Sequence, residues 1–169
     1  GVGKTTIATA VYDKIAPQFE HHCFLENVKE GFTKHSAEQM QEELLTRILK
    51  AKVQSLSILN RGSNMLIERL GMKKVLVVLD DVDKSDQLDA LAGAPDWFGR
   101  GSRIIITTRD KRLFVHDVNH IYKARKLDHH KGFELFNSNA FKNKRNLDDN
   151  EELLVSTIVE YCQGLPLAL

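Results

Sequence analysis

The first six residues, GVGKTT, combine the residue types that bind phosphate. Backbone N–H groups of a glycine-rich turn, together with a helix N-terminus, form a concave site of partial positive charge. Gly1 and Gly3 let the backbone approach a ligand closely. Lys4 reaches β- and γ-phosphate oxygens, and the Thr5 hydroxyl ligates Mg²⁺. Only the second half of the pattern G-x-x-x-x-G-K-[ST] is present, so a glycine-rich helix start without phosphate chemistry is the alternative.

Two adjacent carboxylates, Asp80 and Asp81, directly follow the apolar run VLVVL. In α/β proteins, ligands bind at the carboxyl ends of strands. An aspartate at that position holds Mg²⁺ opposite the Thr5 hydroxyl, so Asp80 is the candidate metal ligand. Asp81 points elsewhere and is the candidate base that polarises an attacking water. The alternative is that both acids, with Asp83, only cap the strand and enter a turn.

Arg109 follows a second apolar run, III at 104–106, after two polar threonines. A guanidinium group binds phosphate oxygens through two parallel hydrogen bonds, so Arg109 is the candidate contact to a γ-phosphate. The alternative is a surface arginine that pairs with Asp110 or another acid.

A sheet and its helices must hold these candidate residues in place. The apolar runs at 75–79 and 104–106 are short and β-branched, which predicts parallel strands buried on both faces. Ser36 and Gln39 form a capping box at the start of one predicted helix. Apolar periodicity and end signals predict helices over 5–15, 36–49, 65–70, 87–92, 111–114, 129–141 and 151–162, and further strands over 22–28 and 121–123.

The alternation of helix and strand ends near residue 125, which predicts an α/β domain over 1–125 and a helical part over 126–169. A phosphate-binding loop normally follows a strand, whereas this chain begins at Gly1. We therefore expect a parallel sheet that lacks its first strand, and a segment truncated at both ends. Because the missing strand would lie within the sheet, we expect the isolated segment to be poorly stable.

Composition excludes several classes of partner. The 169 residues carry a net charge of +1, with 42% hydrophobic and 28% charged residues, which is typical of a soluble globular protein without a general affinity for nucleic acid. We interpret the short basic run at 142–145 as a solvated loop. No apolar run approaches the roughly 20 residues of a membrane span. Cys23 and Cys162 are far apart in the sequence, which favours two reduced thiols in an intracellular protein.

Six ordered motifs resemble those of one known family. They are GVGKTT, FLENVKE, KKVLVVLDDVD, GSRIIITTRD, LDHHKGFELFNSNAF and GLPLAL. In this order they are similar to the NB-ARC motifs of plant intracellular immune receptors, the NBS-LRR disease-resistance proteins. The resemblance covers essentially the whole chain. Asp83 and the FLENV segment are similar to the subclass that carries an N-terminal TIR domain.

The resemblance implies a P-loop NTPase of the STAND type, followed by the start of a helical ARC subdomain. Such modules hold ADP at rest and exchange it for ATP on activation. They hydrolyse ATP slowly, so the chain would be a weak ATPase at most. After the exchange of ADP for ATP they oligomerise, and they work with TIR and leucine-rich-repeat domains of the same receptor. The family's MHD motif, which belongs to a later subdomain, is absent. The implied location is the cytoplasm, with the nucleus as an alternative.

Positions that match the family motifs acquire implied roles. Thr5 and Asp80 would ligate Mg²⁺, and Asp81 would assist hydrolysis. Arg109 would contact the γ-phosphate, and Pro166 of GLPL would pack against adenine unless it merely ends a helix. The residues that would cradle the phosphates are Gly1, Val2, Gly3, Lys4, Thr5 and Thr6. Two other classes stay open: a dedicated P-loop kinase or transport ATPase, and a degenerate interaction module that binds no nucleotide.

Overall fold

The computed structural model describes residues 1–50, 62–115, 118–141 and 147–169. The chain divides into two compact units, and each is described by itself. The sheet unit is Thr5–Val118, and the helical unit is Gly1–Lys4 together with Asn119–Leu169. The basic run at 142–145 lies outside the described residues.

Three parallel strands form the centre of the sheet unit. They lie in the order β1 (His21–Leu25), β2 (Val75–Val82), β3 (Arg103–Thr108). In the register of the sheet, Cys23 is opposite Val77, and Val77 is opposite Ile104. The α/β fold with a parallel sheet is thus confirmed. Because the strands are parallel, their carboxyl ends lie at one edge of the sheet, where α/β proteins bind ligands.

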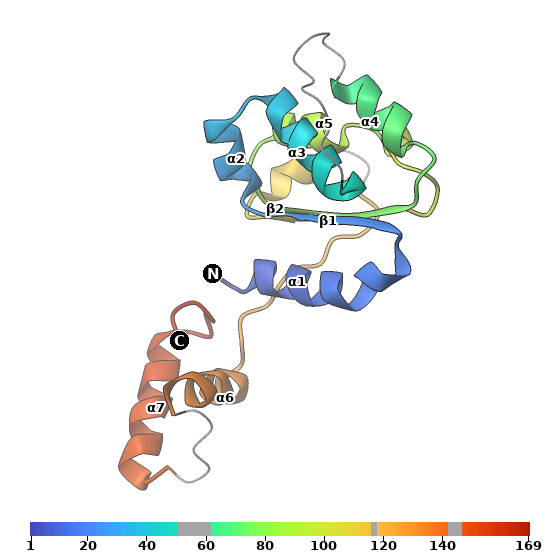
Figure 1. The fold of residues 1–169 in the computed structure, drawn as a ribbon. Helices are drawn as coiled ribbons and strands as arrows, with labels where there is room; N and C mark the ends of the chain where they lie inside the picture. The colour runs from blue at the N-terminus through green and yellow to red at the C-terminus, as the bar shows by residue number, and fades with distance from the viewer. Residues whose placement is uncertain (51–61, 116–117, 142–146) are drawn as a thin grey trace. The chain divides into compact units, whose positions relative to one another are not determined.

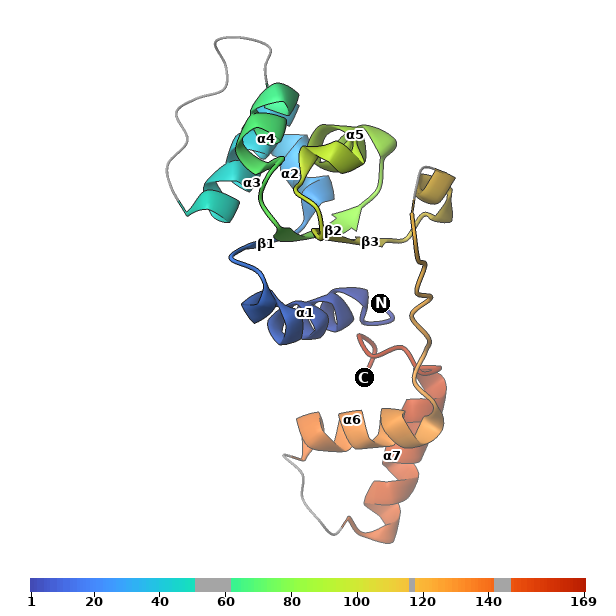
Figure 2. The ribbon, with the colours of Figure 1, turned by 90° about the vertical axis from the view of Figure 1, so that its right-hand side faces the viewer.

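Helices cover both faces of this sheet (Figures 1 and 2). One face carries α1 (Lys4–Ile15) and the 3₁₀ turn η1 (Ala16–Gln18). The other face carries α2 (Val28–Lys34), α3 (Ala37–Leu49), α4 (Gly62–Leu70) and α5 (Ser85–Ala92). Two more 3₁₀ turns are η3 (Pro95–Trp97) and η4 (Lys111–Val115). The helices predicted over 5–15, 36–49, 65–70 and 87–92 are confirmed, with ends that shift by up to a few residues.

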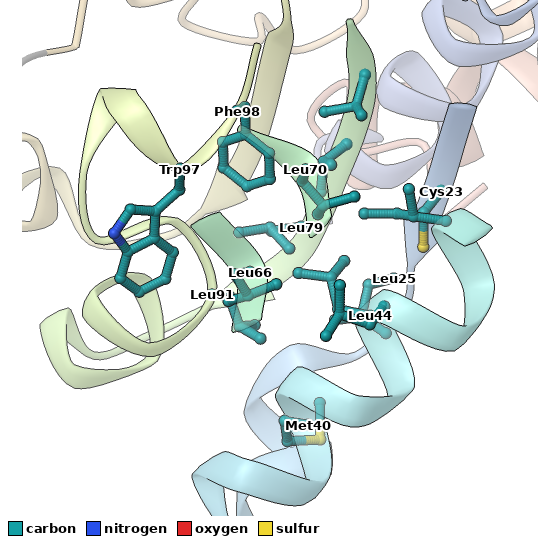
Figure 3. Close-up of a cluster of buried hydrophobic side chains, with 14 of the residues drawn as sticks. Cys23, Leu25, Met40, Leu44, Leu66, Leu70, Leu79, Leu91, Trp97 and Phe98 are labelled. Carbon is teal, nitrogen blue, oxygen red and sulfur yellow. The ribbon is translucent and has the colours of Figure 1, made fainter. Parts of the chain in front are cut away.

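The core of the sheet unit follows the alternation of side chains along β2. Val77 and Leu79 point into a large cluster beneath α2–α5, whose labelled members appear in Figure 3. Leu76 points the opposite way, into a smaller cluster with Ala16 and Phe19 on the α1 face. Burial on both faces requires apolar residues at successive positions, which is why β2 reads as an uninterrupted apolar run.

Three sequence-based expectations are corrected. The first strand ends at Leu25 and not at residue 28, because Asn27 adopts a left-handed conformation (φ 51°) and Val28 begins α2. The isoleucines of β3 are only half-buried, because β3 has a strand neighbour on one side of the described sheet. No strand forms at Ile121–Lys123. A strand needs a hydrogen-bonding neighbour, and this segment pairs with no strand of the described residues and is exposed in the helical unit.

The helical unit contains α6 (His129–Ala140) and α7 (Asp149–Tyr161), which confirms the two helices predicted there. They pack closely at Gly132, where an added Cβ would lie 2.8 Å from Val159 Cγ1. No helix in the described ranges is long and apolar enough to cross a membrane.

Both cysteines are free, as predicted, and both are buried. Burial raises the pKa of the Cys23 thiol to about 12, so this thiol is unreactive near neutral pH. Cys162 lies at the end of α7, where its Sγ is 3.0 Å from the carbonyl oxygen of Ala168.

Candidate functional site

Helix α1 begins at Lys4, directly after a glycine in a left-handed conformation. Gly3 has φ +80°, a value that side chains other than glycine rarely tolerate. This turn lets the chain enter a 12-residue helix whose first turn contains no acidic residue. The positive end of the helix dipole is therefore not neutralised by a carboxylate of its own first turn. Lys4 is half-buried, and Thr5 and Thr6 are exposed.

Asp80 is the centre of the hydrogen-bond network at the carboxyl edge of the sheet. It is only 3% exposed. The Thr5 hydroxyl donates to Asp80 Oδ1 at 2.9 Å and lies 3.2 Å from Oδ2. The Thr107 hydroxyl donates to the same Oδ1 at 2.7 Å. Three elements that are distant in sequence, α1, β2 and β3, thus meet at one carboxylate.

Asp81 faces a different environment from its neighbour Asp80. Its φ is +56°, and its side chain is 33% exposed. The cause is a register shift between β2 and β3: Leu79 is opposite Ile106, whereas Val82 is opposite Thr108. Two aspartates on β2 therefore face one threonine on β3, as in a β-bulge, a feature that re-aims side chains beside active sites. A left-handed residue of this kind costs about 1–3 kcal/mol, which the surrounding structure must supply.

Arg109 pairs with Asp81 across 3.5 Å, from its Nε to Oδ1. The simpler alternative was a surface arginine that pairs with Asp110 or another acid, and it stays open: the Arg109 side chain is 81% exposed and its partner is the acid Asp81, whereas Asp110 binds Arg112 at 2.7 Å. The guanidinium of Arg112 lowers the pKa of Asp110 to about 2. The structure therefore brings the candidate base and the candidate γ-phosphate contact together, and their roles stay predictions.

Asp83 is the acid that enters a turn. Its backbone N–H donates to Gln87 Oε1 at 2.9 Å, and Gln87 Nε2 donates back to Asp83 Oδ1 at 2.9 Å. Lys29 completes the group with an ion pair to Asp83 Oδ2 at 3.0 Å, which lowers the pKa of this carboxyl. The turn-capping alternative thus applies to Asp83, whereas Asp80 is bound by hydroxyls.

A groove of about 870 Å³ lies at the carboxyl ends of all three strands. Its wall is charged, and each of its three cations pairs with an acid of the same wall. The lining residues are Asn27, Lys29, Glu30, Thr33, Asp81, Val82, Asp83, Arg109, Asp110 and Arg112.

In the helical unit, the GLPL segment lies against the first residues of the chain. Leu167 N donates to the carbonyl oxygen of Gly1 at 3.4 Å. A Cβ at Gly3 would lie 3.9 Å from Pro166 Cγ. A hollow of about 750 Å³ in the same unit is lined by Val2 and residues 121–126. Pro166, which sequence analysis links to adenine, is therefore next to the glycine-rich turn.

Comparison with known proteins identifies the family. The model of the NB-ARC domain matches residues 1–146. The chain belongs to the NB-ARC family. It is 40% identical over 171 residues to the disease resistance protein RUN1 of Vitis rotundifolia, and 43% identical over 176 residues to the TMV resistance protein N of Nicotiana glutinosa. Both alignments cover 100% of this chain, which spans only 13% and 15% of those relatives.

Membership explains the architecture, because the NB-ARC domain is a nucleotide-binding P-loop module with an α/β core. The donor set of this NB-ARC domain also fits Mg²⁺. Nucleotide-bound Mg²⁺ uses one or two carboxylates and phosphate oxygens. The Thr5 proton is directed to Asp80, which leaves the oxygen lone pairs of Thr5 available to an ion. The described residues contain no cluster of three or more His, Cys, Asp or Glu that would form an all-protein metal cage.

Sequence reasoning missed several contacts at this edge of the sheet, including those of Gln87 to Asp83. Thr107 contacts Asp80, and Lys29 contacts Asp83. A polar residue at the end of a buried strand was a usable signal for Thr107. No local signal pointed to Lys29, because its partner lies 54 positions away in the sequence (83 minus 29).

Proposed function

We propose that this NB-ARC domain binds ADP and ATP with Mg²⁺ and is the nucleotide switch of a plant disease-resistance receptor of the TIR subclass. The receptor would also contain TIR and leucine-rich-repeat domains, act in defence signalling in the cytoplasm or the nucleus, and oligomerise on activation. Within it, residues 1–125 form the nucleotide-binding subdomain and 126–169 the start of the helical one. The observation that carries the proposal is the hydrogen bond from Thr5, which is part of GVGKTT, to Asp80.

Each candidate residue has a defined task in this proposal. The backbone of Gly1, Val2 and Gly3 and the side chains of Lys4 and Thr6 bind the phosphates. Pro166 packs on adenine, and its position beside Gly3, with Cγ 3.9 Å from where a Cβ of that residue would lie, supports this assignment. Thr5 and Asp80 hold Mg²⁺, which screens phosphate charge when it is bound.

Asp81 and Arg109 distinguish ATP from ADP in this proposal. Arg109 contacts the γ-phosphate, and Asp81 polarises the attacking water. In the present structure they pair with each other, so a γ-phosphate would compete with Asp81 for the guanidinium. A switch from 1:99 to 99:1 requires a difference in affinity of about 5.5 kcal/mol between two states. Contacts made only by the γ-phosphate supply part of it. Hydrolysis would be slow, as suits regulation.

Calorimetric titration with ADP and Mg²⁺ tests nucleotide binding, and the parent protein for it carries the complete loop pattern G-x-x-x-x-G-K-[ST] and its preceding strand in front of this chain. Lys4→Ala removes hydrogen bonds to charged phosphate oxygens, each worth about 1.5–3 kcal/mol, so we expect binding to weaken roughly 10–100-fold. Lys14→Ala is the matched control, because Lys14 is an exposed lysine in the last turn of the same helix. Its ADP affinity should equal that of the parent.

Equal ADP affinity of the parent and Lys4→Ala would contradict the proposal. Absence of ADP binding by the parent would favour the degenerate interaction module. Rapid multiple-turnover ATP hydrolysis would instead favour a dedicated P-loop ATPase or kinase.

A further inference from the structure

Thr107 is a buried residue whose hydroxyl joins the two aspartates of β2. It lies near the end of β3 and is 7% exposed. Its Oγ1 donates to Asp80 Oδ1 at 2.7 Å and accepts a hydrogen bond from Asp81 N at 3.0 Å. A hydroxyl has one proton and two lone pairs, so both contacts form at once without conflict.

The contact to Asp81 N replaces a missing rung of the β-ladder. Asp80 and Asp81 lie between the pairs Leu79–Ile106 and Val82–Thr108, so the register leaves one extra residue on β2. The Asp81 N–H group at this bulge is partly buried, and the side chain of Thr107 supplies an acceptor for it. The left-handed conformation of Asp81 is thereby tied to this one hydroxyl.

The contact to Asp80 determines which carboxylate oxygen is available. Oδ1 accepts from both Thr5 and Thr107, which occupies its two lone-pair directions. Oδ2 is left with the longer 3.2 Å contact to Thr5 alone. Mg²⁺ demands near-ideal octahedral geometry, so rotation of this carboxylate would displace the oxygen that an ion or its water needs.

We infer that Thr107 is a positioning residue of the site. Its hydroxyl orients the Asp80 carboxylate so that Oδ2 faces a divalent cation. Through Asp81 N it also holds the backbone that directs the two carboxylates into different environments. The cation part of this inference rests on the proposed function, whereas the backbone part does not.

Three variants separate the hydroxyl from the packing of the side chain. Thr107→Val keeps the shape and removes both hydrogen bonds, and Thr107→Ser keeps the hydroxyl. Thr108→Val is the matched control, because Thr108 Oγ1 accepts from Asp110 N at 3.0 Å and is not hydrogen-bonded to Asp80 or Asp81. Far-ultraviolet circular dichroism establishes that each variant is folded.

The first measurement is a titration of the ADP-loaded protein with Mn²⁺, in which electron paramagnetic resonance reports how much Mn²⁺ is bound. Loss of a group that orients a metal ligand typically weakens metal affinity 10–100-fold. We expect a weakening of that order for Thr107→Val, and affinities within about 3-fold of the parent for Thr107→Ser and Thr108→Val. ADP affinity measured in EDTA should be the same for all four proteins. The hydrogen bonds of Thr107 go to Asp80 and Asp81, which are not among the residues proposed to bind the phosphates of ADP.

The second measurement needs no nucleotide. Amide hydrogen exchange at Asp81, measured by NMR, should accelerate at least 10-fold in Thr107→Val and stay near the parent value in the other two variants. If the parent binds no ADP, the proposed function fails, and exchange at Asp81 alone decides the backbone part of the inference.

Unchanged exchange at Asp81 in Thr107→Val would overturn the backbone part. If the parent and Thr107→Val both bind ADP and have the same Mn²⁺ affinity, the proposed role of Thr107 in orienting Asp80 would be overturned. If Thr107→Ser lost the Mn²⁺ affinity or the slow exchange at Asp81 to the same extent as Thr107→Val, the assignment of these properties to the hydroxyl would be overturned.

Discussion

Helices α3 and α7 have the same length and the same kind of start, yet they contribute differently to their units. Each has 13 residues and begins with a complete capping box, Ser36 with Gln39 in α3 and Asp148 with Glu151 in α7. α3 buries Met40, Gln41, Leu44, Leu45 and Ile48, whereas α7 buries only Val155 and Val159.

The difference shows that local signals and tertiary packing are separate determinants. Both caps satisfy N–H groups that a helix start leaves free, so both helices begin where their sequences indicate. α3 then packs on β1, α4 and α5, while α7 packs on α6 and exposes Leu153 and Leu154. Burial of a leucine side chain is worth about 1.5–3 kcal/mol, so we expect most of the stability to lie in the sheet unit.

The two units also hold their candidate site residues by different means. In the sheet unit, side-chain hydroxyls hold Asp80. In the helical unit, backbone geometry holds the GLPL segment: Gln163 and Gly164 have φ values of 51° and 71°, and Leu127 N donates to Gly164 O at 2.8 Å. A substitution that keeps the hydroxyl should therefore preserve the position of Asp80, whereas no side-chain exchange can replace the backbone geometry that holds the GLPL segment.

The strongest test of the comparison replaces one leucine in each helix. Leu44→Ala leaves a cavity in the core and should lower the free energy of unfolding by about 3–5 kcal/mol. Leu153→Ala changes a side chain that is 68% exposed and should alter it by less than about 0.5 kcal/mol. Urea unfolding followed by fluorescence of Trp97, the single tryptophan, reports on this core. Equal shifts for the two variants would remove the distinction between the units.

A second test targets the backbone of the helical unit. A Cβ at Gly164 would lie 2.1 Å from the carbonyl oxygen of Leu127, and its φ is unfavourable for alanine. Gly164→Ala should cost roughly 2–3 kcal/mol locally, from strain and the lost hydrogen bond. Amide exchange at Leu127 should accelerate, while the Trp97 transition stays unchanged.

Gly101→Ala is the control for that substitution. Gly101 also has a positive φ, +86°, but the atoms nearest to a Cβ there belong to the flexible Lys74 side chain, at 3.6 Å and beyond. It should show the strain of the left-handed conformation alone, about 1–2 kcal/mol. If the Leu127 amide in Gly164→Ala were as well protected from exchange as in the parent, the role of this backbone contact would be contradicted.

Features that depend on neighbouring residues were predictable from the sequence. The Ser36 cap, the apolar stripe of α3 and the apolar run of β2 each lie within one segment, and the structure confirms them. The meeting of Thr5 with Asp80 followed from a general property of parallel sheets, whose carboxyl ends share an edge.

Features that depend on distant partners were not predictable. The pattern at Ile121–Lys123 is strand-like, but a strand also requires a neighbour, which one segment cannot reveal. The bulge at Asp81 and its pairing with Arg109 depend on the register between β2 and β3. The role of Thr107 depends on the same register, because only the bulge places its hydroxyl between the two aspartates.

The smallest effect concerns two aspartates whose pKa values are lowered by different means. In the sheet unit, Arg112 lowers the pKa of Asp110 to about 2, chiefly through its side chain. In the helical unit, the backbone N–H of Lys131 is the main cause of the lowered pKa of Asp128. Arg112→Met should therefore raise the Asp110 pKa toward its ordinary value of about 3.9, whereas Lys131→Met should leave most of the Asp128 shift in place.

NMR titration of the carboxyl carbons measures both pKa values. A lowered pKa in the folded state means that the contribution of Asp110 to stability is present above about pH 4 and disappears as the pH falls toward 2. In Arg112→Met this acid-dependent contribution should shrink, while Asp128 should keep its own in Lys131→Met because the backbone donor remains. Equal pKa increases in the two variants would show that side-chain charge dominates in both units, and the contrast between side-chain and backbone control would fail at these two residues.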